Sequence, residues 1–240
     1  MERGMWRGGV LALCWLAAWP AGWAEGKSKT GEGSSTSARR AIVVDERFSA
    51  LWEKPGWEGQ WRRRLRRGRV VWLIGPPRIR QEERFHRVAV SRRTRGWIHE
   101  AALVRPGERA DGERLWRVIE ETDDDYVKVS LARLCALHFR GQPVAARALW
   151  LLGETMTRVA YRLTLEAERR LGEIDPIRRR SAMMGFVSLD RYNRLGISFL
   201  YDGASGTLRY DGAAFDELRQ RYPRSAEALR PPPSSPSRRE

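Results

Sequence analysis

Residues 85–104 read FHRVAVSRRTRGWIHEAALV, and the architecture expected for the first half of the chain follows from them. Apolar and polar residues alternate across residues 85–90, which is the two-residue period of a half-buried β-strand. Thr94-Arg95-Gly96 is a turn signal that leads into a second short strand at Trp97-Ile98-His99. Residues 101–104 close the unit with a further apolar run. The pattern therefore predicts short antiparallel strands rather than a helix.

Two apolar runs upstream have the same character. Residues 41–44 read AIVV, and residues 70–74 read VVWLI before the turn signal Gly75-Pro76-Pro77. A long polar segment, which contains the turn signal Lys54-Pro55-Gly56, lies between these two runs. Several short strands within residues 39–107 predict a small antiparallel β-barrel.

The order of these residues resembles the bacterial SH3 domain family. Gly-Trp-Ile-His at residues 96–99, after a basic hairpin, is the most specific part of the match. The resemblance implies an SH3-like barrel over residues 39–105 and a binding role in the cell envelope, where such modules accompany cell-wall hydrolases. The matching positions are Ala50, Leu51, Trp52, Pro55, Gly56, Leu65, Gly68, Val71, Leu73, Phe85, Val88, Gly96, Trp97, Ile98, His99 and Leu103.

The basic charge of the chain is concentrated in the same region. The whole chain has 45 Lys and Arg against 30 Asp and Glu, a formal net charge of +15. Residues 39–107 hold 18 basic and seven acidic residues, whereas residues 108–230 hold 21 and 19 and are close to neutral. We therefore expect the barrel to carry a positive face that attracts anions, because guanidinium groups bind phosphate and carboxylate with paired hydrogen bonds. A general abundance of arginine without a binding role is the alternative. The candidate anion-binding residues are Arg62, Arg63, Arg64, Arg66, Arg67, Arg69, Arg92, Arg93 and Arg95.

Four tryptophans of this region are candidate aromatic contacts for a partner. Trp52, Trp57 and Trp61 fall in the long polar segment, which we interpret as a loop, and we expect one of them to be exposed. Trp97 has two interpretations. It either packs within the barrel with its indole N–H on a backbone carbonyl, or it stacks against a sugar or peptide.

Residues 108–230 predict a mainly helical region. A first helix is expected over residues 111–122, and Asp123-Asp124-Asp125 can cap the start of the second. The second helix ends at Gly141-Gln142-Pro143, and a longer amphipathic helix follows over residues 144–171. Two antiparallel helices joined by such a short turn form a helical hairpin.

The end of this region predicts a β-hairpin over residues 196–210, with the turn DGASG at residues 202–206, and a last helix over residues 213–221. A turn with an aromatic residue before it and alanine after it occurs at residues 139–145 and again at residues 222–228. This partial repeat resembles tetratricopeptide helix packing. The predicted fold class is α+β, a small SH3-like antiparallel barrel followed by a helical region with a hairpin near its end.

The two ends of the chain predict targeting and spacer segments. Residues 1–24 have a basic start, an apolar run of about 12 residues and small residues at Gly22 and Ala24, as in a secretory signal peptide. The run is shorter than the ~20 residues of a membrane-spanning helix, so an uncleaved signal anchor is the less favoured alternative. We expect cleavage near Ala24, a periplasmic or extracellular location and no later transmembrane segment. Residues 25–38 predict a flexible linker, and residues 231–240 a disordered tail.

The sequence indicates no catalytic residue, metal site or cofactor. Two of the three histidines, His86 and His99, lie within the predicted barrel, which leaves too few for the usual zinc ligand sets. Cys135 and His138 are three residues apart on a predicted helix, but the leucines beside them indicate a buried, inert thiol. Glu166 and Glu168 fit an exposed helix face better than a glycosidase pair.

We therefore expect a non-catalytic, exported protein that binds or scaffolds in the cell envelope. In this hypothesis the barrel binds a cell-wall component, another anionic envelope component or an envelope protein, and the helical region docks a further protein. Nucleic-acid binding through the same arginines is one alternative, which export disfavours. A purely structural role is the other.

Overall fold

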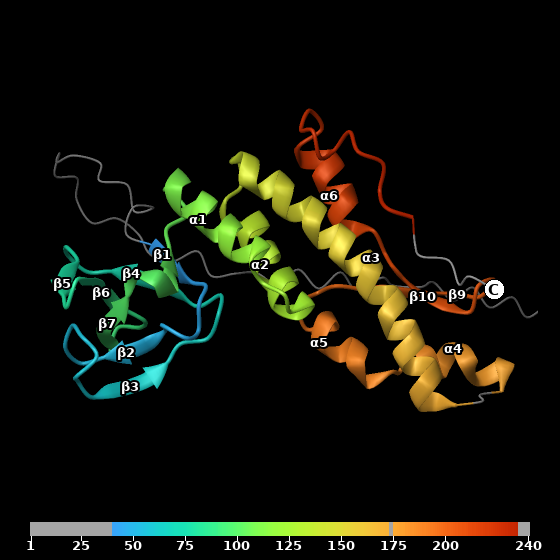
Figure 1. The fold of residues 1–240 in the computed structure, drawn as a ribbon, viewed down its shortest axis with the longest axis horizontal. Helices are drawn as coiled ribbons and strands as arrows, with labels where there is room; N and C mark the ends of the chain where they lie inside the picture. Colours follow the sequence, from blue (N-terminus) through green and yellow to red (C-terminus); the bar gives the residue numbers. More distant parts are fainter. Residues whose placement is uncertain (1–39, 173–174, 235–240) are drawn as a thin grey trace, which may run out of the picture. The chain divides into compact units, whose positions relative to one another are not determined.

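The computed structural model describes residues 40–172 and 175–234, and these belong to one compact unit. The predicted signal peptide and linker, residues 1–38, lie outside the described residues, as do residues 235–240 of the predicted tail. An antiparallel sheet comes first in the chain, and helices with a two-stranded hairpin follow it (Figure 1). The α+β class predicted from the sequence is confirmed.

The sheet contains eight strands, and a short 3-10 helix, Glu100–Ala102, precedes the last of them. The strands are β1 (Arg40–Val43), β2 (Ala50–Trp52), β3 (Trp61–Arg64), β4 (Val70–Leu73), β5 (Arg78–Arg80), β6 (Glu83–Ala89), β7 (Arg95–His99) and β8 (Leu103–Val104). The elements that follow are α1 (Arg109–Glu120), α2 (Asp125–His138), α3 (Pro143–Leu171), α4 (Pro176–Met184), a 3-10 helix (Val187–Leu189), α5 (Asp190–Asn193), β9 (Phe199–Asp202), β10 (Thr207–Tyr210) and α6 (Ala213–Arg221).

The sheet is open, so the predicted closed barrel is not formed. Its strand order is β3-β2-β7-β6-β4-β1-β8, with β5 paired to β6, and all pairs are antiparallel. Within the described residues the two end strands, β3 and β8, do not pair with each other. Three of the four residues of β3 are arginine and all four are exposed, which is the kind of charged edge that resists further pairing.

One face of the sheet buries an apolar core to which Leu51, Val71, Val88 and Ile98 contribute. Gly96 sits inside β7 rather than in the turn predicted for residues 94–96, because β7 begins at Arg95. A Cβ atom at this position would lie 2.6 Å from Cγ of Leu51 and 2.7 Å from the carbonyl oxygen of Trp52. Glycine is therefore required for the close approach of β2 and β7.

The segment interpreted as a long loop between the first two apolar runs contains two strands. Trp52 ends β2 and Trp61 begins β3, so only Trp57 of the three tryptophans lies in a connection. The interpretation was wrong because β3 is an edge strand with no buried side chain, and its sequence lacks the apolar alternation that marks a strand.

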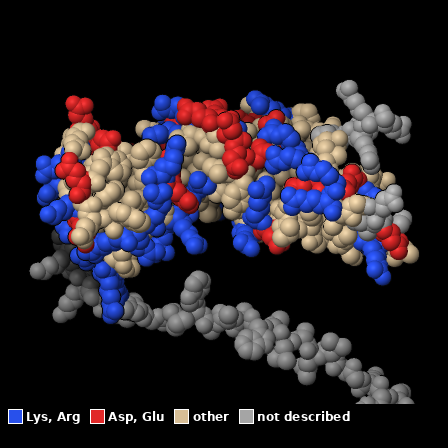
Figure 2. Space-filling view, turned by 60° about the horizontal axis from the view of Figure 1, so that its bottom comes forward, with Lys and Arg blue, Asp and Glu red and all other residues tan. Residues whose placement is uncertain are grey.

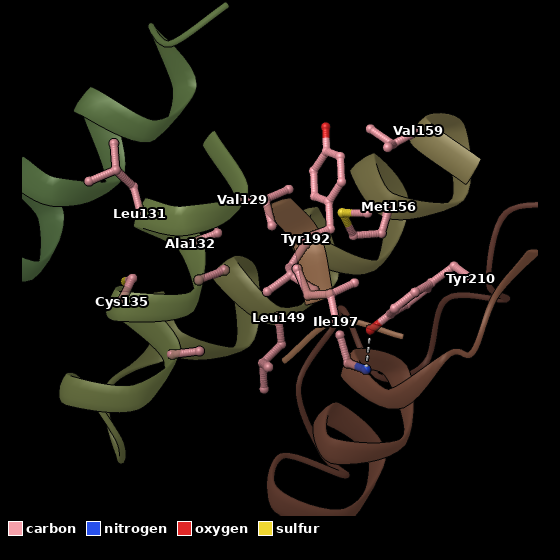
Figure 3. Close-up of a cluster of buried hydrophobic side chains, with 14 of the residues drawn as sticks. Val129, Leu131, Ala132, Cys135, Leu149, Met156, Val159, Tyr192, Ile197 and Tyr210 are labelled. Atoms are coloured by element: carbon pink, nitrogen blue, oxygen red, sulfur yellow. Dashed lines mark hydrogen bonds between the residues drawn. The ribbon is translucent and has the colours of Figure 1, made fainter. Parts of the chain in front are cut away.

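The helical hairpin predicted from the sequence is present as α2 and α3, which pack against each other, and α6 and β10 pack on α3 (Figure 1). Asp124 caps α2 by accepting a hydrogen bond from the backbone N–H of Val127 at 2.8 Å. Figure 3 shows the apolar core between these elements, in which Tyr192 and Met156 are fully buried. The predicted hairpin near the end is formed by β9 and β10.

Two features of the helical region differ from the sequence-based expectation. The sequence did not predict α4 and α5, which are short and carry few buried side chains. The second copy of the partial repeat, residues 222–228, forms turns rather than the start of a helix. The two copies nevertheless meet, since the backbone N–H of Gly141 donates to the Tyr222 hydroxyl at 3.4 Å.

The sheet and the helices share an apolar cluster that includes Ile42 and Val104 of the sheet. Asp111 also links α1 to the segment that follows β8, because its carboxylate accepts hydrogen bonds from the backbone N–H and Nε of Arg105, both at 2.8 Å. Residues 107 and 108, the predicted domain boundary, lie in the connection between β8 and α1, and the division stays a prediction. No helix in the described part of the chain is long and apolar enough to cross a bilayer.

Candidate binding face on the sheet

A row of tryptophans crosses the face of the sheet opposite its apolar core. Trp52 of β2 lies directly opposite Trp97 of β7 and, on its other side, opposite Trp61 of β3. An irregularity in the β2–β3 pairing brings Trp61 rather than Arg62 to this position. Because directly opposed residues in an antiparallel pair extend from the same face, the three indoles are cross-strand neighbours.

Arginines continue this row on the adjoining strands. Arg87 of β6 lies opposite Trp97, and the guanidinium of Arg78 is 5.4 Å from the centre of the Trp97 ring, within the range of a cation–π contact. A second row beside the first contains Trp72 of β4 and Arg95 of β7, with Ala89 between them. We call the surface formed by Trp52, Trp61, Trp72, Trp97, Arg78, Arg87 and Arg95 the Trp–Arg face.

The exposure of these indoles decides which of them a partner can reach. Trp61 is 60% exposed and Trp72 is 48% exposed, whereas Trp52 and Trp97 are half-buried. Nε1 of Trp52 is buried and has no hydrogen-bond partner among the residues that the structure describes. Trp97 is half-buried with Arg78 over its ring, and both interpretations of its role stay predictions.

Of the three tryptophans among which one was expected to be exposed, Trp61 is the exposed one, whereas Trp57 is held by neighbouring aromatic rings. Its ring packs edge-on against Trp52 and Phe85 and also contacts His99, with ring centres 5.2–5.8 Å apart. Its Nε1 donates a hydrogen bond to Glu83. Trp57 therefore covers one end of the Trp–Arg face as part of a small aromatic cluster.

The candidate arginines separate into two groups according to their partners. Arg62 pairs with Glu53 at 3.0 Å, Arg67 donates to the carbonyl of Val44, and Arg69 donates to the carbonyl of Val90. The second group is exposed and takes part in no ion pair or side-chain hydrogen bond within residues 40–172 and 175–234. It consists of the candidates Arg63, Arg64, Arg66, Arg92, Arg93 and Arg95 together with Arg87.

The charge distribution agrees with this separation. Figure 2 shows basic side chains crowded over the part of the molecule that contains the sheet, while basic and acidic side chains alternate over the helices. In the helices Asp125 pairs with Arg158 and Arg162, and Glu113 pairs with Arg147. The free guanidinium groups of the sheet are thus available to an anionic partner.

The groups considered for catalysis are engaged in structural contacts. Burial raises the pKa of the Cys135 thiol to about 12, so the thiol stays protonated at neutral pH. Glu166 pairs with Arg170 at 3.0 Å, and Glu168 pairs with Arg179. In the described ranges no cluster of three or more His, Cys, Asp or Glu side chains could hold a metal ion.

The sequence interpretation missed Trp72 as a candidate contact. The run of residues 70–74 was predicted only as an apolar strand, with no assignment of its faces, and in the structure only Val71 of β4 is fully buried. Alternation within an antiparallel sheet with one open face is the signal that could have placed Trp72 outside. Arg87 was not among the candidate residues either, because its position opposite Trp97 depends on strand register, which sequence alone does not define.

Comparison with known proteins finds no matching family model, no similar curated protein and no similar solved structure. The proposed function is therefore argued from the residues of the Trp–Arg face.

Proposed function

We propose that this chain is a non-catalytic, exported binding protein that holds an anionic polymer of the cell envelope on its Trp–Arg face. The observation that carries the proposal is the row of Trp61, Trp52 and Trp97 with unpaired arginines beside it. Flat indole rings stack on the faces of sugar rings, and free guanidinium groups bind the carboxylates or phosphates of such a polymer. The signal peptide expected at residues 1–24 supports an envelope partner.

We also propose that the sheet is an open variant of the bacterial SH3 module. The order of its short strands and the glycine at position 96 support this relationship, since Gly96 allows the contact between β2 and β7. The open edge at β3 is consistent with a binding surface, because it leaves Trp61 and the neighbouring arginines uncovered. The helical region, in this proposal, docks a second envelope protein.

The experiment is a pulldown of the mature protein on purified peptidoglycan with its attached anionic polymers, across a salt series. Wild-type protein should bind at low salt and dissociate as salt rises, because salt screens contacts between exposed charges. Absence of binding at every salt concentration would overturn the proposal.

Two variants and their matched controls test the face itself. Arg87→Glu with Arg95→Glu should weaken binding by about tenfold or more, which corresponds to ~1.4 kcal/mol. Arg117→Glu with Arg169→Glu changes the net charge equally on exposed positions of α1 and α3 and should leave binding within about twofold. Trp61→Ala should also weaken binding, whereas Ile177→Ala, at an exposed site on α4, should not. Equal effects in the two charge-reversal variants would point to net charge alone, and binding that stays unchanged in every variant would contradict a binding role for the Trp–Arg face.

Single-stranded nucleic acid is a second candidate partner, because tryptophan rows flanked by arginine also stack bases and contact phosphates. Cell fractionation separates the two candidates. An exported protein meets envelope polymers, whereas a cytoplasmic location together with tight binding of a single-stranded oligonucleotide would favour the nucleic acid.

A further inference from the structure

A separate pocket lies in the helical region, between α2, α3, α6 and the segment before β9. Its volume is about 280 Å³, just below the ~300–1,000 Å³ typical of small-molecule sites. Leu149, Leu152 and Ile197 give it an apolar floor, and all three are buried. We call it the α2–α6 pocket.

Cationic groups outnumber acidic ones at this pocket. Arg133, Arg140 and Arg221 line it, and Glu217 is its only carboxylate among the described lining residues. Glu217 is already paired with Arg221 at 3.0 Å. The side chains of Arg133 and Arg140 are exposed, and neither guanidinium group forms an ion pair or hydrogen bond with any residue that the structure describes. Two guanidinium groups are therefore left to compensate an incoming negative charge.

Arg133 is placed beside the pocket by the backbone next to it. A Cβ atom at Gly196 would lie 3.0 Å from Nη2 and 3.1 Å from Nη1 of Arg133, so the guanidinium packs against the bare glycine. Gly196 has a φ of +69°, a conformation in which glycine is favoured. The turn and the arginine thus fit together, and the guanidinium is partly positioned before a ligand binds.

The Tyr210 hydroxyl adds a neutral donor to the same pocket. Its oxygen accepts a hydrogen bond from the backbone N–H of Ala214 at 2.8 Å, as the dashed line in Figure 3 shows. The hydroxyl hydrogen has no acceptor within the described part of the chain. Burial raises the pKa of Tyr210 to about 12, so the phenol keeps this hydrogen at neutral pH and can donate it to an anion.

We infer that the α2–α6 pocket binds a small anionic amphiphile, an aliphatic chain with a carboxylate or phosphate head. The head lies between Arg133 and Arg140, within reach of the Tyr210 hydroxyl, and the chain covers the apolar floor. A neutral amphiphile would leave the two guanidinium groups without a counter-charge, and a cationic one would be repelled by them. This site is distinct from the Trp–Arg face, and its test does not depend on the polymer.

The test is a calorimetric titration of the mature protein with decanoate and, separately, with decyl phosphate. Both ligands are kept below micelle-forming concentrations. We expect saturable binding of at least one of them, with decanol about tenfold weaker or undetectable because it lacks the charged head. Preference between decanoate and decyl phosphate identifies the head group. No saturable binding of either anion, or equal binding of decanol, would overturn the inference.

Substitutions at the pocket complete the test. Arg133→Gln or Arg140→Gln should each weaken anion binding by about tenfold, whereas Arg117→Gln on α1 should not change it. Leu137 lines the pocket but is 46% exposed, so Leu137→Glu places a repelling charge there without burying it. Leu165→Glu, at a site on α3 that is 43% exposed, is the matched control. Binding that survives Leu137→Glu in a folded protein would place the ligand elsewhere and contradict the inference.

Discussion

Gly96→Ala tests the packing that holds the tryptophan row together. The new methyl group would lie 2.6 Å from Cγ of Leu51 and 2.7 Å from the carbonyl oxygen of Trp52. The leucine can change rotamer, but the carbonyl belongs to the backbone of β2 and cannot move without shifting the strand. The substitution therefore forces apart the two strands that carry Trp52 and Trp97.

The expected cost is the difference between two opposing effects. Overpacking a tight core site costs ~1–3 kcal/mol, and replacing glycine within a strand recovers ~0.5–1 kcal/mol of backbone entropy. Because one of the clashing atoms belongs to the backbone, we expect the overpacking cost to lie in the upper part of its range. The net loss in the free energy of unfolding should then be about 1–2 kcal/mol.

Urea denaturation followed by tryptophan fluorescence measures this loss. Gly59→Ala is the control, because the nearest atom to its new Cβ is 3.8 Å away and its backbone is not left-handed. The control should stay within about 0.5 kcal/mol of wild type. If Gly96→Ala were as stable as the control, the close contact between β2 and β7 would be refuted.

Three further predictions concern buried ionisable groups, each checked on the purified protein. Desolvation alone would raise the pKa of Asp111, but its hydrogen bonds from Arg105 hold the pKa below 3.8, so the carboxylate stabilises the fold above that pH. Asp111→Asn should cost about 2 kcal/mol at neutral pH by urea denaturation, and the difference from wild type should shrink as pH falls through the lowered pKa. Burial lowers the pKa of His86 below 6.5, because its effect exceeds the opposing effect of Glu100. The unfolded chain therefore binds a proton more readily than the folded protein, so the free energy of unfolding should decline as pH drops below 6.5. His86→Gln should flatten that decline. Cys135, with its pKa raised to about 12, should resist a thiol reagent in the native mature protein, which lacks Cys14 of the expected signal peptide, and should react after unfolding in urea. Fast labelling of the native mature protein would contradict the burial of Cys135.

The elements that periodicity could predict were those with one clearly buried face. The helices near α1, α2, α3 and α6 and the hairpin of β9 and β10 were expected close to their observed bounds. The strand β3 was not, because its sequence Trp-Arg-Arg-Arg has no apolar alternation and is defined only by pairing with β2. Pairing between distant segments is a tertiary property that local pattern does not contain.

For the candidate site, too, the sequence predicted some features, while others depend on tertiary structure. Composition located the basic charge in residues 39–107, and the structure shows which arginines remain without a partner there. Composition could not separate Arg69, which binds the carbonyl of Val90, from Arg95, which is exposed on the Trp–Arg face. Nor could it align Trp61, Trp52 and Trp97, because that alignment depends on strand register.

The affinity of the Arg87→Glu, Arg95→Glu variant for a purified anionic wall polymer, measured against salt beside wild type, tests the central claim most directly. The proposal predicts that wild-type affinity falls steeply as salt increases, and that the variant binds about tenfold more weakly at low salt with a shallower dependence. Identical curves for wild type and variant would contradict a binding role for the Trp–Arg face.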